Sequence, residues 1–105
     1  MTETVVITGI ARTPMGAFKG AFTDVAAPDL GAVAIKAAML EANVATDSVE
    51  QVIMGCVLPA GQGQAPARQA ALGADLPMAA EAVTVNKMCG SGMQAAIMAH
   101  DTIIA

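Results

Sequence analysis

Short β-branched runs alternate with helical stretches along the whole chain, and this order constrains the fold more than any other feature of the sequence. The predicted strands are 5–10, 51–57 and 82–85, and the predicted helices are 29–42, 66–73 and 91–105, with a short helical turn at 46–50. Strands separated by helices pair in parallel, because a helical crossover carries the chain back to the starting end of the sheet. The order therefore predicts an α/β fold with a mainly parallel sheet and helices on its faces.

The ends of the predicted helices carry residues that favour helix boundaries. Asp29 is expected to cap the first helix, and Asn43 is expected to end it in a left-handed conformation. Pro66 suits the first turn of the second helix, and Gly73 suits its end. These signals predict helix bounds without reference to packing.

The last predicted helix is apolar around most of its circumference, which is typical of a buried helix. The sequence ends within this pattern at Ala105, with no capping residue and no following strand. Only 13% of the residues are charged, against roughly 25% in an average soluble domain. We therefore expect residues 1–105 to be a partial domain, truncated at its C-terminus, that belongs to a larger assembly.

Charge and cysteine content argue against several classes of function. The net charge is −4 and the five basic residues are scattered, so nucleic acid is not an expected partner. The N-terminus has no secretory signal, and no apolar stretch approaches the roughly 18 residues that cross a bilayer, so no membrane partner is expected. Two cysteines, Cys56 and Cys89, are too few for a disulfide framework or a metal site, and a reducing, cytoplasmic location is expected.

The run from Asn86 to Ala95 places Cys89 where a predicted strand turns into a predicted helix. The three residues after it, 90–92, are Gly, Ser and Gly, which are small enough to let another molecule approach the backbone. The free N–H groups at a helix N-terminus stabilise a nearby thiolate and can bind the oxygen of a carbonyl under attack. Cys89 is therefore the candidate catalytic nucleophile of an acyl transfer through a thioester.

Four motifs in the same order give the chain a resemblance to a known family. They are Ala-Arg-Thr-Pro-Met-Gly at 11–16, Asp-Leu-Gly at 29–31, the stretch 52–70 with Gly-Gln-Gly-Gln-Ala-Pro-Ala-Arg-Gln-Ala at its end, and Val-Asn-Lys-Met-Cys-Gly-Ser-Gly-Met-Gln-Ala at 85–95. With these motifs the sequence resembles the N-terminal part of thiolases over its whole length. It departs from the family pattern at Cys56 and Ala65, where many members have Asn, and this leaves the preferred substrate open.

The resemblance implies a thiolase-like layered α/β fold, of which residues 1–105 form an incomplete N-terminal half with a buried helix behind the nucleophile. It implies acyl transfer between acyl-CoA molecules, by Claisen condensation or by thiolysis of a 3-ketoacyl-CoA, with Cys89 as nucleophile and its own N–H in the oxyanion hole. Acyl-CoA and CoA are then substrates, no metal or prosthetic group is expected, and the full-length parent is expected to form a homo-oligomer. In thiolases a histidine, a second cysteine and an asparagine complete the site from a C-terminal half that this sequence lacks.

The residues present supply no obvious base for Cys89. His100, the only histidine, follows Cys89 by 11 positions on the same predicted helix, which places it roughly 16 Å away. We expect His100 to lie on a helix face and Cys56 to be a small core residue. Two alternatives therefore stay open: an inactive or assembly-only thiolase fragment, and another enzyme of the same fold such as a ketoacyl synthase.

Other notable residues are expected to have structural roles. Asn86 and Lys87 are expected to hold the strand-to-helix turn, and Arg68 is expected to pair with a carboxylate within the fold. The run 61–66 is similar to a dinucleotide-binding loop, but Pro66 replaces its third glycine. We therefore expect a packed turn there rather than a nucleotide site.

Overall fold

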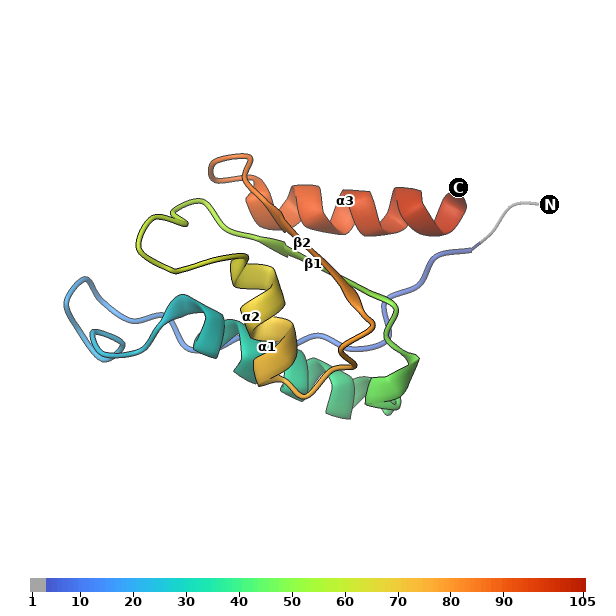
Figure 1. The fold of residues 1–105 in the computed structure, drawn as a ribbon, viewed down its shortest axis with the longest axis horizontal. Coiled ribbons are helices and arrows are strands. Elements are labelled where there is room, and N and C mark those ends of the chain that lie inside the picture. The colour runs from blue at the N-terminus through green and yellow to red at the C-terminus, as the bar shows by residue number, and fades with distance from the viewer. Residues whose placement is uncertain (1–3) are drawn as a thin grey trace.

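The computed structural model describes residues 4–105 and places helices on both sides of a small sheet. Its elements in chain order are α1 (Ala27–Ala42), the 3-10 helix η1 (Thr46–Ser48), β1 (Gln51–Gly55), α2 (Pro66–Gly73), β2 (Glu81–Val85) and α3 (Ser91–Ile104). The helices α1 and α2 lie together on one side of the strands, and α3 lies on the other side (Figure 1). This is the layered α/β arrangement that the sequence predicts.

The two strands pair in parallel, as predicted, with Gln51 opposite Glu81 and Gly55 opposite Val85. The crossover between them contains α2, whose first turn is tied to the second strand: the N–H of Ala67 donates to Thr84 Oγ1 at 3.0 Å. Parallel pairing brings the carboxyl ends of both strands to one edge of the sheet. The loops that follow β1 and β2 therefore leave the sheet side by side (Figure 1).

The predicted helix boundaries are confirmed at three points and wrong at one. The bounds of α2 are Pro66–Gly73, as predicted, and Asn43 caps the C-terminal end of α1 in the left-handed conformation, with φ 53°. Asp29 does not cap α1, because the helix begins earlier, after Ala26, which makes no side-chain capping bond. Proline lacks the N–H that the first helical turn leaves unpaired, so the helix can start ahead of Pro28 and place Asp29 inside its first turn.

Small side chains let α1 and α2 approach each other closely. A Cβ built on Gly31 would lie 3.1 Å from Ala70 Cβ, and one built on Gly73 would lie 3.1 Å from Ala32 Cβ. The main buried cluster next to this contact consists of Ala32, Val52, Ala71, Ala74 and Leu76. The core of the described residues is therefore built mostly of alanine methyl groups.

The predicted strand at 5–10 is wrong: residues 4–17 belong to no helix or strand. The segment passes so close to α1 that a Cβ on Gly9 would collide with the carbonyl oxygen of Ala38. A strand needs a hydrogen-bonded neighbour, and within residues 4–105 the sheet contains only β1 and β2. The β-branched side chain of Ile7 is consequently 84% exposed.

The predicted burial of the last helix holds only for the face of α3 that packs on the sheet. Ser91 and Ala95 are buried, whereas Met93 is 74% exposed and Ile97 is 45% exposed. An open groove of about 980 Å³ runs between residues 9–11, β1 and α3. None of the helices in the described residues has the length and apolar character needed to cross a membrane.

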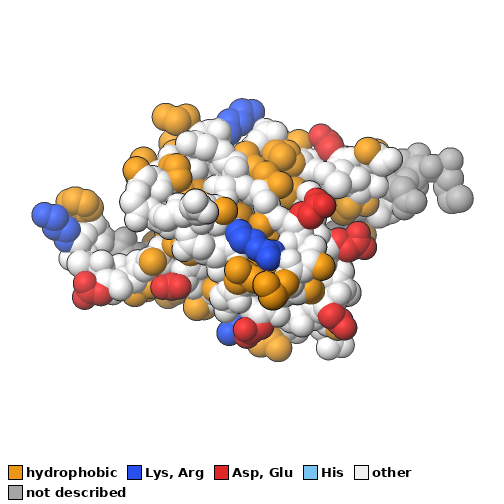
Figure 2. All heavy atoms as spheres, in the orientation of Figure 1, with side chains coloured by type: hydrophobic (Ala, Val, Ile, Leu, Met, Phe, Trp, Pro, Cys, Tyr) orange, Lys and Arg blue, Asp and Glu red, His pale blue; other side chains and the backbone are white. Residues whose placement is uncertain are grey.

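Charged residues make up only 13% of the sequence. Figure 2 shows Lys and Arg at separate positions on the visible face, among exposed hydrophobic side chains. This face carries no gathered basic patch of the kind that binds nucleic acid.

Replacing Gly55 with alanine tests the close packing of α3 on the end of β1. The added Cβ would lie 2.5 Å from Gly92 N and from Ser91 C, so backbone must shift. We expect Gly55→Ala to lower the free energy of unfolding by about 1–3 kcal/mol, measured by urea denaturation. Gly92→Ala is the matched control, because a Cβ there has no atom within 4 Å, and it should be neutral or stabilising. Equal stability of the two variants would contradict this account.

Candidate active site

The loop between β2 and α3 carries Cys89 and is anchored at its first residue, Asn86. The side-chain oxygen Oδ1 of Asn86 accepts the N–H of Met88 at 3.1 Å, and Nδ2 donates to the carbonyl oxygen of Val57 at 3.3 Å. One side chain therefore shapes its own loop and ties it to the chain that follows β1. The predicted structural role of Asn86 is confirmed.

The loop reverses direction through a left-handed residue immediately before Cys89. Met88 has φ 49°, a conformation that costs roughly 1–2 kcal/mol for a residue with a Cβ. The turn is closed by two backbone bonds, from Gly90 N–H to Lys87 O at 3.0 Å and from Ser91 N–H to Met88 O at 3.2 Å. The left-handed conformation of Met88 therefore determines the direction in which the backbone enters Cys89.

Ser91 is the buried polar residue of this turn, with 4% of its surface exposed. Its Oγ accepts the N–H of Lys87 at 2.9 Å and donates to the carbonyl oxygen of Met88 at 2.6 Å. The Lys87 side chain turns the other way, and its Nζ donates to Gln94 Oε1 on α3 at 3.3 Å. The backbone N–H and the side-chain ammonium of Lys87 therefore both bind residues of α3, as predicted for a residue that holds the turn.

Cys89 is an exposed free cysteine directly ahead of α3, whose N-cap residue is Gly90. Within residues 4–105, no backbone carbonyl accepts a hydrogen bond from the N–H of Cys89, Gly92 or Met93. Such unpaired N–H groups are the usual state of the first turn of a helix and form a site of partial positive charge. The arrangement combines a reachable thiol with hydrogen-bond donors for an anionic oxygen.

Cys56 lies on the neighbouring loop and is half-buried. Its Sγ lies 3.8 Å from Gln62 Oε1, in a weak S–H donor contact. The same loop is fastened to α2 by Gln69, whose Nε2 donates to the carbonyl oxygens of Gln62 and Gln64, both at 2.7 Å. The structure shows a turn at 61–66 that is tied to α2, although residues 61 and 63–65 are exposed rather than packed. Cys56 is only half-buried and lies outside the buried cluster, so its predicted core position is wrong.

The predicted carboxylate partner of Arg68 is wrong. Its guanidinium donates instead to two carbonyl oxygens, those of Ala80 at 2.8 Å and Met78 at 2.9 Å. These carbonyls belong to the turn between α2 and β2, which would otherwise leave them without a protein donor. Arg68 therefore fixes the approach to β2 from the helix side.

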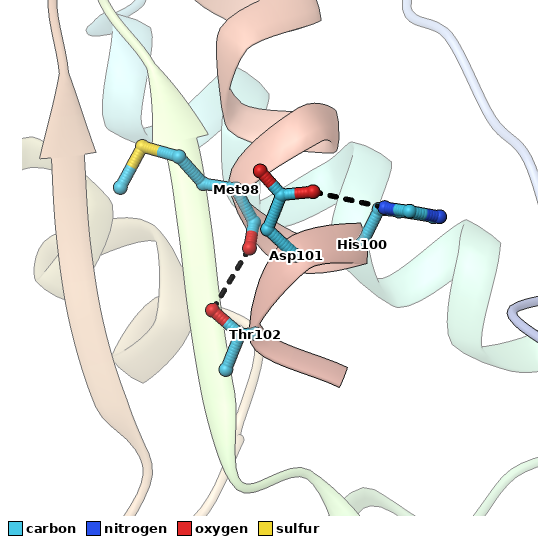
Figure 3. A network of polar contacts seen from close by, with 4 residues as sticks. All are labelled: Met98, His100, Asp101 and Thr102. Atoms are coloured by element: carbon cyan, nitrogen blue, oxygen red, sulfur yellow. Dashed lines mark hydrogen bonds and ion pairs between the residues drawn. The ribbon is translucent and has the colours of Figure 1, made fainter. Parts of the chain in front are cut away.

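His100 lies near the C-terminal end of α3 (Figure 3). Cys89 precedes the N-terminal end of the same helix, so the two are remote from each other, as expected. Its Nδ1 lies 3.0 Å from Asp101 Oδ1, and both side chains are largely exposed. The structure does not bring His100 to the candidate nucleophile. Among residues 4–105 there is also no group of three or more His, Cys, Asp or Glu side chains placed to hold a metal ion.

The family of the chain follows from comparison with known proteins. The family model described as "Thiolase, N-terminal domain" matches residues 5–105. The chain belongs to the thiolase family. Its resemblance to thiolases at the level of motifs is thereby confirmed.

Relatives of this thiolase chain carry the name acetyl-CoA acetyltransferase. One from Cupriavidus necator is 52% identical over 105 residues, which is 100% of this chain and 26% of the relative. Acetyl-CoA acetyltransferase 2 of Arabidopsis thaliana is 52% identical over 99 residues, covering 94% of this chain and 25% of the relative. The chain thus spans about a quarter of the length of these relatives, which are enzymes of the thiolase family.

A solved thiolase confirms the fold. The Acat5 thiolase of Ascaris suum, in complex with coenzyme A, matches with a TM-score of 0.90 and 38% identity, over 92% of this chain and 25% of that one. This match and the family model favour the thiolase assignment over the ketoacyl synthase alternative.

The two thiols of this thiolase domain are expected to differ in reactivity. Cys89 is exposed, whereas Cys56 is half-buried and in contact with Gln62. Under native conditions iodoacetamide should modify Cys89 several-fold faster than Cys56, measured by mass spectrometry of the cysteine peptides. In urea the two rates should converge. Faster modification of Cys56 in the folded chain would contradict the structure of this site.

Proposed function

We propose that this thiolase domain supplies the acyl-accepting cysteine, Cys89, of an acetyl-CoA acetyltransferase. The observation that carries the proposal is the exposed Cys89 thiol at the start of α3, next to N–H groups that no backbone carbonyl of residues 4–105 engages. The names of the relatives and the coenzyme A complex of the Ascaris suum thiolase support CoA thioesters as substrates.

The proposed step is a transfer between two thioesters. The Cys89 thiolate forms a bond to the carbonyl carbon of an acyl-CoA, and the carbonyl oxygen becomes an anion that backbone N–H groups can stabilise. Collapse of this intermediate breaks the bond between carbon and the CoA sulfur, and the CoA thiolate leaves and takes up a proton. The cysteine itself then holds the acyl group, so the step requires no prosthetic group.

The second half of the proposed reaction consumes that acyl group. The α-carbon of a second acetyl-CoA, after giving up a proton to a base outside residues 1–105, attacks the carbonyl carbon of the Cys89 thioester. The bond between that carbon and the cysteine sulfur then breaks, which releases the Cys89 thiolate and a 3-ketoacyl-CoA. In the reverse direction the Cys89 thiolate attacks the 3-keto carbon of the 3-ketoacyl-CoA, and acetyl-CoA leaves as the carbon–carbon bond breaks. The thiolate of CoA then takes the acyl group from Cys89 and releases the cysteine. Homo-oligomerisation and a cytoplasmic location remain predictions for the protein in which this domain works.

A chimera tests the proposal in a complete enzyme. Residues 1–105 replace the matching part of the Cupriavidus necator relative, which aligns with the whole of this chain at 52% identity. We expect the chimera to catalyse thiolysis of acetoacetyl-CoA, and we expect Cys89→Ser to lower kcat by several orders of magnitude. The measurement is the loss of acetoacetyl-CoA absorbance on addition of CoA.

Two comparisons make this test decisive. Cys56→Ser in the same chimera should retain activity, because Cys56 is held in a separate loop contact. The 105-residue chain alone should show no turnover, since it holds the nucleophile without a base near it. An active Cys89→Ser chimera would refute the proposed role, and Cys89-dependent turnover by the chain alone would refute the need for the remaining residues.

A further inference from the structure

We propose that Ser91 is a positioning residue for Cys89, because its buried hydroxyl holds the left-handed turn at Met88 that presents the thiol. This inference rests on the proposed function of Cys89 and adds the element that orients it. Ser91 itself does not touch the reacting atoms. It acts through the backbone of the two residues that precede Cys89.

The hydroxyl of Ser91 connects the two sides of the turn. It accepts the N–H of Lys87 at 2.9 Å and donates to the carbonyl oxygen of Met88 at 2.6 Å. The peptide group between Asn86 and Lys87 and the one between Met88 and Cys89 are thereby held relative to the start of α3. Met88, with its left-handed φ of 49°, lies between these two contacts. Loss of the hydroxyl would therefore allow Met88 to relax from this strained backbone conformation.

Ser91 is in turn fixed by the sheet. A Cβ built on Gly55 would lie 2.5 Å from Ser91 C and 2.7 Å from Ser91 O, so the Ser91 backbone rests directly on the end of β1. With 4% of its surface exposed, Ser91 has little room to change rotamer. The sheet, through Gly55 and Ser91, therefore determines where Met88 and Cys89 lie.

Burial cannot hold the thiol, since Cys89 is exposed. The flanking side chains do not enclose it either, since Met88 is 72% exposed and Met93 is 74% exposed. The position of Cys89 relative to the free N–H groups of α3 therefore depends on the backbone turn. A displacement of about 1 Å at such a group can cost on the order of 100-fold in rate.

The test measures thiol capture in the 105-residue chain with a Cys56→Ser substitution, so that Cys89 is the only cysteine. Ser91→Ala should slow the capture of Cys89 by iodoacetamide several-fold across the pH profile. Adding Met88→Gly to Ser91→Ala should bring the rate back close to that of the parent chain, because glycine adopts the left-handed conformation without steric cost. This rescue separates positioning from a general loss of stability.

Thr102→Ala is the matched control. Thr102 also lies on α3, and its hydroxyl donates to Met98 O at 2.8 Å, at the other end of the helix (Figure 3). Its loss should leave the capture rate of Cys89 unchanged. In the chimera, Ser91→Ala should lower kcat by roughly 10- to 100-fold with little change in KM, whereas Thr102→Ala should keep both values.

Each outcome decides the proposal. An unchanged capture rate in Ser91→Ala, or no recovery on adding Met88→Gly, would show that Ser91 does not position Cys89. If Ser91→Ala fails to fold, the double variant should fold, and a double variant that also fails would overturn the inference. Failure of the proposed function gives a different result, because the Cys89→Ser chimera would then keep its thiolysis activity whatever residue stands at position 91.

Discussion

The contact between the end of β1 and the start of α3 is the constraint on which the rest of the site depends. At Gly55 the strand has no side chain, and the backbone of Ser91 and Gly92 occupies the space that a Cβ would fill. The helix can therefore begin directly over the carboxyl ends of the two parallel strands. A larger residue at position 55 would move the first turn of α3 away from the sheet, and the loop that carries Cys89 would move with it.

The same use of small residues extends through the body of the molecule. The buried cluster is mainly alanine, and within residues 4–105 no large side chain is fully buried. Each buried CH₂ contributes only about 0.8 kcal/mol, so a cluster of alanine methyl groups gives little hydrophobic stabilisation per residue. Larger apolar residues such as Ile7, Leu40 and Met93 lie mostly exposed. The described residues thus hold a precise backbone arrangement with a modest core.

Features with a local cause could be predicted from the sequence. Pro66 and Gly73 mark the ends of α2 because their backbone preferences act within a turn, and Asn43 ends α1 for the same reason. The location of Cys89 between β2 and α3 also follows from neighbouring residues. Features that depend on distant partners could not be predicted. The run at 5–10 has strand composition but no neighbouring strand, and Arg68 finds carbonyl groups ten and twelve residues away.

Ser91 shows the same limit within the candidate site. In the motif it reads as one of three small residues that leave space for a ligand, and its backbone does lie in a tightly packed place. The hydrogen bonds of its hydroxyl hold a left-handed turn at Met88. Nothing in a methionine side chain predicts that conformation, so these bonds could not be predicted from the sequence. In the proposed function the Cys89 thiol meets a bulky thioester and has to be exposed, so burial cannot position it, and the turn beneath it has to be held instead. We propose that a strained backbone residue, Met88, a buried hydroxyl on Ser91 and a glycine on the supporting strand, Gly55, meet that requirement together.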